Sequence, residues 1–382
     1  MGVLRPVAVG SGAAALALIP ELAHALDGAG ALLPVPADDD RQAALLTETL
    51  RAGEPVGDGV ALVVSTSGST GIPKGALLST AALHASADAT HDRLGGPGRW
   101  LLALPAYHVA GVQVLVRSLR AGTTPVALDP GFDVGELPSA VSALGPGRRY
   151  TSLVSVQLAK ILADAAATAA LAELDAVLIG GGPMPAGLGE KAAAAGISVV
   201  RTYGMSETCG GCVYDGTPLA GVQLRVDDTG RVALGGPTLA SGYRNPVDPS
   251  PFVDGWFVTD DIGAVDDSGV LRVLGRVDDA IATGGLKVLP ALVESAVAGH
   301  PAIAECAVFG VPDDRLGQRV AIAVVLHPGT TAPTVADLRE HVSATLAATA
   351  APREVHVVAE LPRRGIGKLD RRALTLRYQK NA

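Results

Sequence analysis

The sequence predicts an α/β protein: a mostly parallel sheet covered by helices, a small β region, and a smaller α+β domain at the C-terminus. From about residue 60 to 204, short apolar or β-branched runs alternate with amphipathic stretches rich in Ala and Leu. Between residues 216 and 274, Gly, Pro and short alternating segments replace the helices, and a second α+β pattern follows Arg276. At 382 residues the chain exceeds the usual size of one core. We therefore expect a large domain over 1–277 and a small one over 278–382.

The strands and helices of the large domain can be assigned in order. The strand candidates are short apolar runs at 61–64, 100–104, 125–128, 152–154, 176–179 and 199–202. The helix candidates between them are residues 81–94, 109–119, 157–170 and 186–195. Strands separated by helices pair in parallel through right-handed crossovers. Ligands of such sheets bind at the carboxyl ends of the strands.

Composition and charge exclude several classes of protein. Hydrophobic residues make up 48% and charged residues 18%, which is a globular composition. A net charge of -8 argues against nucleic-acid and anionic-membrane partners, which need a concentrated basic face. Gly10 and Gly12 interrupt the apolar residues 7–19, so we interpret them as strand, turn and helix rather than a signal peptide, and we expect no membrane insertion. Three cysteines cannot form a disulfide framework, and we expect the reducing cytoplasm.

A loop rich in hydroxyl groups and glycine follows the predicted strand 61–64. It reads Ser-Thr-Ser-Gly-Ser-Thr-Gly-Ile-Pro-Lys-Gly from Ser65 to Gly75. Lys74 adds a positive charge, and the small residues of the loop let the backbone approach a polyphosphate. These small residues are Thr66, Ser67, Gly68, Ser69, Thr70 and Gly71. It is not a Walker loop, because Pro73 and Gly75 flank the lysine. The alternative of a flexible linker is weaker, since the loop leaves a strand.

Two further segments follow strands of the same predicted sheet. The triple-glycine turn Gly180-Gly181-Gly182-Pro183 comes after strand 176–179, and Gly181, Gly182 and Pro183 are its candidate site residues, because glycine lets the backbone approach a flat ring. Its alternative is an ordinary strand-to-helix turn. After strand 199–202 come an aromatic ring, hydroxyls and a hard carboxylate ligand for magnesium, in the order Tyr203, Gly204, Met205, Ser206, Glu207 and Thr208. A lone Glu after a strand is usually a solvated loop residue.

In this order, the motifs closely resemble those of the acyl-CoA synthetase, adenylation-domain and firefly-luciferase superfamily, from about Val60 to the end of the chain. The resemblance implies that the loop at Lys74 clamps ATP phosphates and that the triple-glycine turn lines the adenine pocket. It also implies Tyr203 against adenine, Ser206 near the α-phosphate and Glu207 on the metal.

The second half of the chain carries three further motifs of this superfamily. Asp261 matches the aspartate that holds the ribose, and a carboxylate can accept two hydrogen bonds from a vicinal diol. Asp260 stands where the family has glycine, so which aspartate acts stays open. The resemblance implies that Arg276 touches the ribose and that Asp278 is the hinge of the small domain. It further implies a pantetheine tunnel lined by Gly284 and Gly285, and a catalytic lysine, Lys368.

The resemblance implies that ATP and Mg²⁺ activate a carboxylic acid to acyl-AMP, which then passes to CoA. The brief N-terminal region and the segment from Leu104 to Gly111 resemble the short actinobacterial ligases that join 2-succinylbenzoate to CoA in menaquinone biosynthesis. His108 within that segment is either a residue of the acyl pocket or a packed core histidine. Another aryl or fatty acid, or a carrier-protein thiol as acceptor, stays open.

Other readings are weaker. The segment Gly10-Ser11-Gly12 after an apolar run suggests an NAD-dependent dehydrogenase, but the first acidic residue after the next strand, Asp38, comes late for that fold. Cys209 and Cys212 have metal spacing without a second pair, so we expect no structural zinc. The sequence does not distinguish a monomer from a homodimer.

Overall fold

The computed structural model describes residues 2–66, 72–129, 131–185, 187–364 and 368–379. The chain divides into two compact units. The first comprises Met1–Met184, Leu188–Arg225 and Ala233–Thr259; the second comprises Pro185–Gly187, Val226–Val232 and Asp260–Ala382. By this division Asp260 already belongs to the second unit. The domain boundary at residue 277 therefore remains a prediction from the motifs.

The first unit begins with a four-stranded sheet in the order β1-β2-β3-β4. Its strands are β1 (Leu4–Val9), β2 (Ala31–Pro36), β3 (Val60–Val64) and β4 (Ala76–Ser79). The first three are parallel and β4 is antiparallel to β3. The connections contain η1 (Gly12–Ala17), α1 (Leu18–Leu26) and α2 (Asp40–Thr49). The strand, turn and helix expected near the N-terminus are confirmed, and Leu18 and Leu22 of α1 are buried in the core.

The second sheet of this unit has seven strands in the order β11-β10-β9-β8-β7-β5-β6. They are β5 (Arg99–Leu102), β6 (Val126–Ala127), β7 (Arg149–Val154), β8 (Ala176–Gly180), β9 (Val199–Met205), β10 (Gly210–Tyr214) and β11 (Thr217–Pro218). The strands from β5 to β9 are parallel, as predicted. The expectation of one sheet over residues 60–204 is wrong: β3 lies in the first sheet, because its neighbours are β2 and β4.

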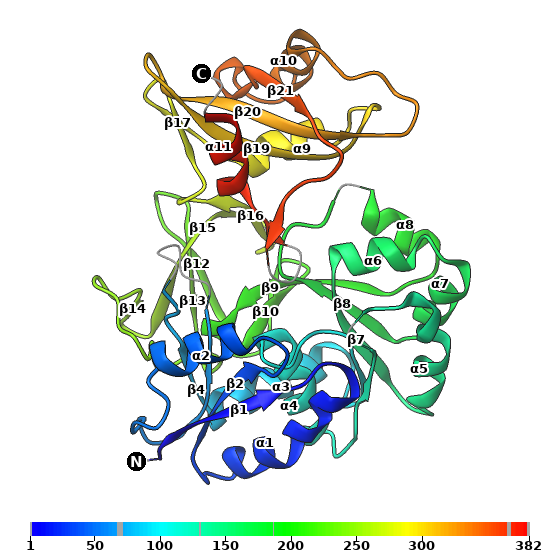
Figure 1. The fold of residues 1–382 in the computed structure, drawn as a ribbon, viewed down its shortest axis with the longest axis vertical. Coiled ribbons are helices and arrows are strands. Elements are labelled where there is room, and N and C mark those ends of the chain that lie inside the picture. The colour runs from blue at the N-terminus through cyan, green and yellow to red at the C-terminus, as the bar shows by residue number, and fades with distance from the viewer. Residues whose placement is uncertain (1, 67–71, 130, 186, 365–367, 380–382) are drawn as a thin grey trace. The chain divides into compact units, whose positions relative to one another are not determined.

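Helices cover both faces of the seven-stranded sheet. They are α3 (Thr80–Arg93), α4 (Val109–Arg120), α5 (Leu137–Ala143), α6 (Ser155–Ile161), α7 (Ala165–Ala172) and α8 (Leu188–Ala194). Consecutive strand residues enter opposite cores, since Trp100 packs with residues of α3 and α4, and Leu101 with residues of α5 and α7. Figure 1 shows α5, α6 and α7 beside β7 and β8.

One predicted helix is two. The expected helix 157–170 is interrupted, with α6 ending at Ile161 and α7 beginning at Ala165. Asp164 caps α7, because its carboxylate accepts a hydrogen bond from the amide of Ala167 at 2.8 Å. In the described part of the chain no single helix is long and apolar enough to span a membrane; α6 and α7, bent by 116°, pass that test only together.

A five-stranded sheet follows, where the sequence predicts a small β region. Its order is β12-β13-β15-β14, with β16 paired to β15. The strands are β12 (Gln223–Val226), β13 (Arg231–Gly235), β14 (Phe252–Val253), β15 (Trp256–Val265) and β16 (Leu271–Arg276).

The rest of the second unit is α+β, as expected. A sheet in the order β18-β17-β20-β19, with β21 parallel to β20, is formed by β17 (Ile281–Thr283), β18 (Leu286–Val288), β19 (Ile303–Asp313), β20 (Gly317–Leu326) and β21 (Glu354–Val357). Beside it are α9 (Pro290–Val297), α10 (Val335–Ser343), η4 (Ala348–Ala350) and α11 (Arg371–Tyr378). Val308 packs in one core, and its neighbour Phe309 packs in a second one that includes Leu374 of α11. The sheet is thus buried on both faces.

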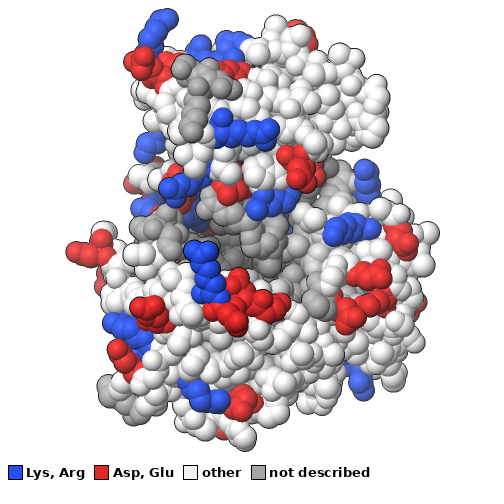
Figure 2. Space-filling model, in the orientation of Figure 1, with Lys and Arg blue, Asp and Glu red and all other residues white. Residues whose placement is uncertain are grey.

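Charged side chains are mixed rather than segregated on the face drawn in Figure 2, where basic and acidic groups lie next to one another. Exposed pairs of this kind include Arg120 with Asp88 at 2.7 Å and Arg149 with Glu173 at 3.3 Å. Such pairs contribute roughly 0–1 kcal/mol each, so the buried apolar cores stabilise the fold.

Candidate active site

The phosphate-loop motif begins where β3 ends. Ser67, Gly68, Ser69, Thr70 and Gly71 lie outside the described residues. The hydroxyl oxygen of Thr66 is buried and has no hydrogen-bond partner in the part of the chain that the structure describes. Buried hydroxyls normally have a partner. The position of Thr66 therefore fits a ligand oxygen close to the loop.

The backbone around Lys74 is fastened to a distant segment of the same unit. The carbonyl oxygens of Lys74 and Gly75 accept hydrogen bonds from the amides of Asn245 (2.9 Å) and Arg244 (2.7 Å). The side-chain amide of Asn245 donates to the carbonyl of Pro73 at 3.0 Å. Gly75 has φ +72°, and a Cβ there would lie 2.7 Å from Leu50 Cδ2. The backbone at the end of the loop, which carries the Lys74 side chain, is therefore fixed.

Lys74 and Glu207 meet at one aromatic ring. The ammonium of Lys74 lies 5.2 Å from the centre of the Tyr243 ring. The hydroxyl of Tyr243 donates a hydrogen bond to Oε1 of Glu207 at 2.7 Å. The structure thus brings together two residues that the sequence motifs single out, through a third that sequence reasoning missed. Nothing in the local sequence around Tyr243 signals this role, because its partners lie far away along the chain.

Glu207 lies in a short 3-10 turn, η3 (Ser206–Thr208), directly after β9. The hydroxyl of Thr208 accepts from the amide of Met205 at 3.0 Å and donates to the carbonyl of Gly210 at 2.7 Å. Cys209, with φ +53°, ends the turn. Its carbonyl accepts hydrogen bonds from Ser86 Oγ at 3.0 Å and Gln113 Nε2 at 2.8 Å. The turn that carries Glu207 is therefore held by α3 and α4.

The Glu207 carboxylate fits a magnesium ion that is held mainly by the phosphates of the substrate. Glu207 is only 8% exposed and supplies a carboxylate. No group of three or more His, Cys, Asp or Glu side chains gathers anywhere in the described residues. Magnesium is commonly held by one or two carboxylates together with substrate phosphates and water. A single carboxylate beside a phosphate loop matches that pattern.

Gly204 allows β9 and β10 to approach each other. A Cβ at this position would lie 2.1 Å from the carbonyl oxygen of Gly210 and 2.7 Å from Gly211 Cα. Because both atoms belong to the backbone, neither can turn away. Adjacent strand backbones at this point leave no room for any side chain.

We therefore expect Gly204→Ala to destabilise the protein by roughly 1–3 kcal/mol through overpacking. That loss lowers the melting temperature by roughly 2–10 °C for a domain of this size. Thermal unfolding followed by circular dichroism measures it. Gly182→Ala is the matched control, because a Cβ at Gly182 has no neighbour within 4 Å. Equal melting temperatures for the two variants would contradict the role given to Gly204.

The triple-glycine turn and Tyr203 lie at the same edge of the sheet. The last register pair of β8 and β9 is Ile179 with Arg201, so Gly181, directly after β8, and Tyr203, within β9, each follow two residues later. Gly181 has φ +83°, which favours glycine. Gly182 and Pro183 are exposed. The structure therefore groups the residues expected around adenine at the carboxyl end of β8 and β9.

His108 precedes α4, which supplies Gln113 to the turn at Cys209. The His108 ring contacts Tyr107 with 4.6 Å between ring centres. Burial lowers the pKa of His108, so the ring is neutral at neutral pH.

Cys209 and Cys212 are both buried, and burial raises the pKa of Cys212 to about 12. At neutral pH these two groups are therefore protonated thiols.

The ribose motif lies in the second unit, on the paired strands β15 and β16. Asp261 and Arg276 are register partners, and Arg276 Nη1 lies 3.5 Å from Asp261 Oδ1. Asp260 is exposed and pairs with Arg231, whereas Asp261 is 7% exposed. Arg276 also holds Asp278, from Nε to Oδ1 at 2.8 Å. Burial opposes the charge of Arg276, but its hydrogen bond to Asp278 and the nearby carboxylates raise its pKa overall.

The two remaining motifs also lie in the second unit. Gly284 and Gly285, at φ +57° and +81°, form the turn between β17 and β18. Lys368 begins β23 (Lys368–Leu369), which pairs with β22 (Arg363–Arg364). Lys368 is therefore placed by a two-stranded hairpin.

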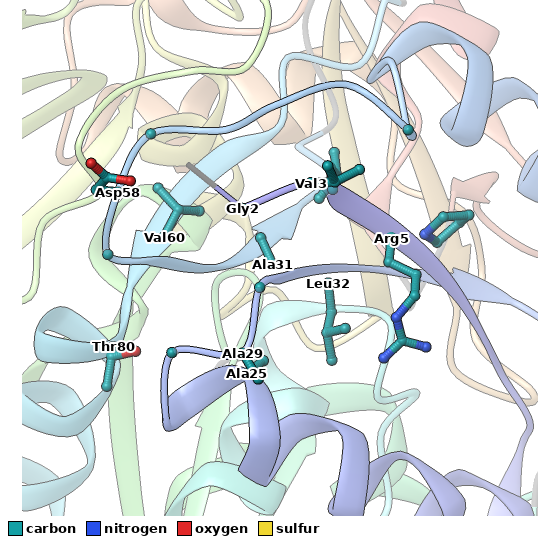
Figure 3. Close-up of a pocket in the computed structure, with 17 residues that line it drawn as sticks. Gly2, Val3, Arg5, Ala25, Ala29, Ala31, Leu32, Asp58, Val60 and Thr80 are labelled. Carbon is teal, nitrogen blue, oxygen red and sulfur yellow. The ribbon is translucent and has the colours of Figure 1, made fainter.

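A cavity of about 710 Å³ lies elsewhere in the first unit. It is bordered by Arg5 near the start of β1, by Ala31 and Leu32 at the start of β2, by Asp58 before β3 and by Val60, the first residue of β3 (Figure 3). None of its described lining residues belongs to the motifs above. Ligands of parallel sheets bind at the opposite, carboxyl ends of strands. This cavity therefore shares no described lining residue with the candidate site, where Lys74 and Glu207 contact Tyr243.

The fold and the site together define an enzyme that binds ATP phosphates and forms adenylates. The AMP-binding enzyme model matches residues 15–244, and the AMP-binding enzyme C-terminal domain model matches residues 292–368. The chain belongs to the AMP-binding enzyme family. This confirms the superfamily predicted from the motifs and decides against a dehydrogenase.

The chain is also similar to individual proteins over nearly its whole length. The chain is 62% identical over 381 residues to a protein of Mycobacterium tuberculosis named "Probable 2-succinylbenzoate--CoA ligase", covering 98% of both chains. It is 26% identical to o-succinylbenzoate CoA synthetase from Bacillus subtilis in complex with an acyl-adenylate intermediate, with a TM-score of 0.76 and coverage of 98% and 88%. For the Bacillus subtilis enzyme with ATP and magnesium ion, identity is 26%, the TM-score 0.75 and coverage 97% and 89%.

Proposed function

We propose that this protein is a 2-succinylbenzoate–CoA ligase, which uses ATP and Mg²⁺ to form an acyl-AMP and then transfers the acyl group to CoA. One observation carries the adenylation step: Lys74 and Glu207 meet at Tyr243, and the phosphate loop that ends at Lys74 begins with the buried, unpartnered hydroxyl of Thr66. The acyl group is supported by the 62% identity to the mycobacterial relative over nearly the whole chain. The product belongs to menaquinone biosynthesis.

In the first half-reaction, a carboxylate oxygen of the acid attacks the α-phosphorus and pyrophosphate leaves. The phosphate loop from Thr66 to Lys74 holds the leaving phosphates, and Ser206 lies near the α-phosphate. Lys368 offsets charge that develops between the carboxylate and the phosphorus. Glu207 would hold Mg²⁺, which would neutralise charge on the phosphate oxygens. Two anions repel each other, so positioning and positive charge are the main contributions of this chain.

The other nucleotide contacts complete the binding of ATP. The turn from Gly181 to Pro183 and the ring of Tyr203 bind adenine, and Gly204 and Met205, which follow Tyr203, line the same adenine pocket. Asp261 accepts hydrogen bonds from the ribose, with Arg276 beside it. Asp261 is preferred over Asp260, because Asp260 is exposed and its carboxylate is engaged by Arg231.

In the second half-reaction, the thiol of CoA attacks the acyl carbonyl and AMP leaves. The C-terminal domain, residues 278–382, turns about Asp278 and withdraws Lys368. Gly284 and Gly285 line the passage for pantetheine, where an absent side chain leaves space. In the first unit, His108 faces the acyl group, and its neutral ring can donate a hydrogen bond to a carboxylate.

The proposal also concerns where and in what form the protein works. We place it in the cytoplasm, where ATP and CoA are available and where the buried thiols Cys209 and Cys212 remain reduced. A homodimer is the alternative to a monomer, and light scattering distinguishes the two.

Exchange of labelled pyrophosphate into ATP tests the substrate. We expect 2-succinylbenzoate to support exchange with kcat/KM at least about 10²-fold above benzoate, a fatty acid or malonate, because a site built for polar groups rejects ligands that leave them unpaired. Adding CoA to the same reaction then yields the thioester and AMP. Preference for another acid refutes the assigned substrate, and turnover only with a carrier-protein thiol refutes the acceptor.

A further inference from the structure

We propose that Tyr243 is a positioning residue for adenylation, one that aligns the metal ligand Glu207 and the phosphate-loop residue Lys74 with each other. The inference rests on the proposed function, because it takes the roles of Glu207 and Lys74 from it. Tyr243 contacts both Glu207 and Lys74, and these two groups must act on the same polyphosphate.

The hydroxyl of Tyr243 controls the orientation of the Glu207 carboxylate. It donates to Oε1 at 2.7 Å, and Glu207 is almost completely buried. A hydrogen bond to an ionised carboxylate is strong, and one fixed oxygen determines the direction of the other. Partners that orient a ligating group commonly change metal affinity by about 10–100-fold when they are removed. Tyr243 therefore tunes how Glu207 presents itself to Mg²⁺.

The ring of Tyr243 guides Lys74. The ammonium lies 5.2 Å from the ring centre, within the range of a cation–π interaction. The ring itself is held edge-on against Phe252, with 5.3 Å between ring centres. Phe252 in turn packs against Phe257 at 4.9 Å. The aromatic face therefore limits where the flexible lysine side chain can go.

The backbone of Tyr243 is tied to β4, the strand that leaves the phosphate loop. Tyr243 bridges to Ala76, and Leu77 exchanges hydrogen bonds with the carbonyl of Gly242 at 3.0 Å and the amide of Ser241 at 2.9 Å. The guanidinium of Arg244 then donates to the carbonyls of Leu50 (3.1 Å), Pro55 (2.6 Å) and Arg51 (3.0 Å). The backbone of Tyr243 is therefore fixed next to the strand that follows the phosphate loop.

The two contacts of Tyr243 can be separated by substitution. Tyr243→Phe removes the hydroxyl and keeps the ring under Lys74. Tyr243→Leu removes both. We expect Tyr243→Phe to raise the Mg²⁺ concentration at half-maximal pyrophosphate exchange by about tenfold and to reduce the rate at saturating Mg²⁺ by less than about threefold. We expect Tyr243→Leu to raise the KM for ATP as well.

Tyr150→Phe is the matched control. Its hydroxyl is also lost from the interior, where it donates to the carbonyls of Leu94 at 3.1 Å and Gly96 at 2.9 Å, near the amino end of β7. We expect this variant to lower the melting temperature without moving the Mg²⁺ dependence. A purely structural role of Tyr243 would give the same behaviour, that is, lower stability with an unchanged Mg²⁺ dependence, and would overturn the proposal.

The double variant with Glu207→Ala tests the route of the effect, because alanine removes the oxygen that accepts the hydrogen bond from Tyr243. If Tyr243 acts through the carboxylate, Tyr243→Phe changes the Mg²⁺ dependence no further in the Glu207→Ala background. Additive effects in the double variant overturn the proposal.

Binding separates this inference from the proposed function. ATP binding to the wild type and to Tyr243→Phe is measured by titration calorimetry over a range of Mg²⁺, without any acid. If the wild type binds ATP but no acid supports exchange, the proposed function fails. The same titrations still decide about Tyr243: a shifted Mg²⁺ dependence supports its role, and an unshifted one refutes it.

Discussion

Replacement of Lys368 by alanine is expected to reduce acyl-AMP formation by at least about 10²–10³-fold, the usual cost of removing a charge-stabilising donor. Thioester formation from supplied acyl-AMP should stay within about threefold of the wild-type rate, because the thiol attack does not use this lysine. The reason is electrostatic. Attack of a carboxylate on an already anionic phosphate brings like charges together, whereas a neutral thioester forms in the second step.

The fold around Lys368 makes this variant interpretable. The hairpin that carries it is closed by the amide of Asp370, which donates to the carbonyl of Pro362 at 2.8 Å. The next residue, Arg371, donates to the carboxylates of Glu294 at 2.7 Å and Asp279 at 3.1 Å. These anchors are made by other residues, so we expect removal of the Lys368 side chain to leave the C-terminal domain folded.

The two half-reactions are measured separately, by pyrophosphate exchange and by release of AMP from synthetic acyl-AMP with CoA. Lys191→Ala is the control, because Lys191 is an exposed lysine on α8 outside the motifs. It should retain both rates. Equal loss of both half-reactions in Lys368→Ala would contradict a lysine that serves only adenylation.

Glu207→Gln is expected to reduce Mg²⁺-dependent adenylation by about 10²-fold, because the amide removes the charge of the proposed metal ligand while preserving its size. The substituted amide would still offer an oxygen to the hydroxyl of Tyr243, so the turn at Ser206–Thr208 should persist. Increasing the Mg²⁺ concentration should restore part of the rate, since the substrate phosphates also bind the ion.

Rates of pyrophosphate exchange over a Mg²⁺ series check this prediction, with melting temperature as the measure of folding. Glu190→Gln is the control, because it removes the same charge from the first turn of α8. A Glu207→Gln enzyme with wild-type rates at all Mg²⁺ concentrations would show that this carboxylate does not hold the metal.

Local sequence pattern predicted most of the large domain. Runs of apolar residues located the parallel strands β5 to β9 to within a few residues, since each is short and bounded by polar turns. The pairing of β3 was not predictable, because the run 61–64 looks the same whichever sheet it enters. β10 was missed because it starts with Gly210 and Gly211, which have low strand propensity.

The site shows the same division between local and distant information. Motifs located Lys74, Tyr203 and Glu207 because each follows a strand in a short, characteristic segment. Tyr243 was missed, since its significance comes from a hydrogen bond to a residue 36 positions earlier and from a contact with Lys74. An isolated tyrosine outside any predicted helix or strand carries no such signal in one sequence.

Oxygen transfer tests the central claim most directly. The enzyme is incubated with ATP, Mg²⁺, CoA and 2-succinylbenzoate whose carboxylates are labelled with ¹⁸O, and the nucleotide product is analysed by mass spectrometry. The account predicts AMP that carries one ¹⁸O atom, because a carboxylate oxygen bonds to the α-phosphorus and stays there when the thiol takes the acyl group. Unlabelled AMP, or ADP with labelled phosphate, would contradict it.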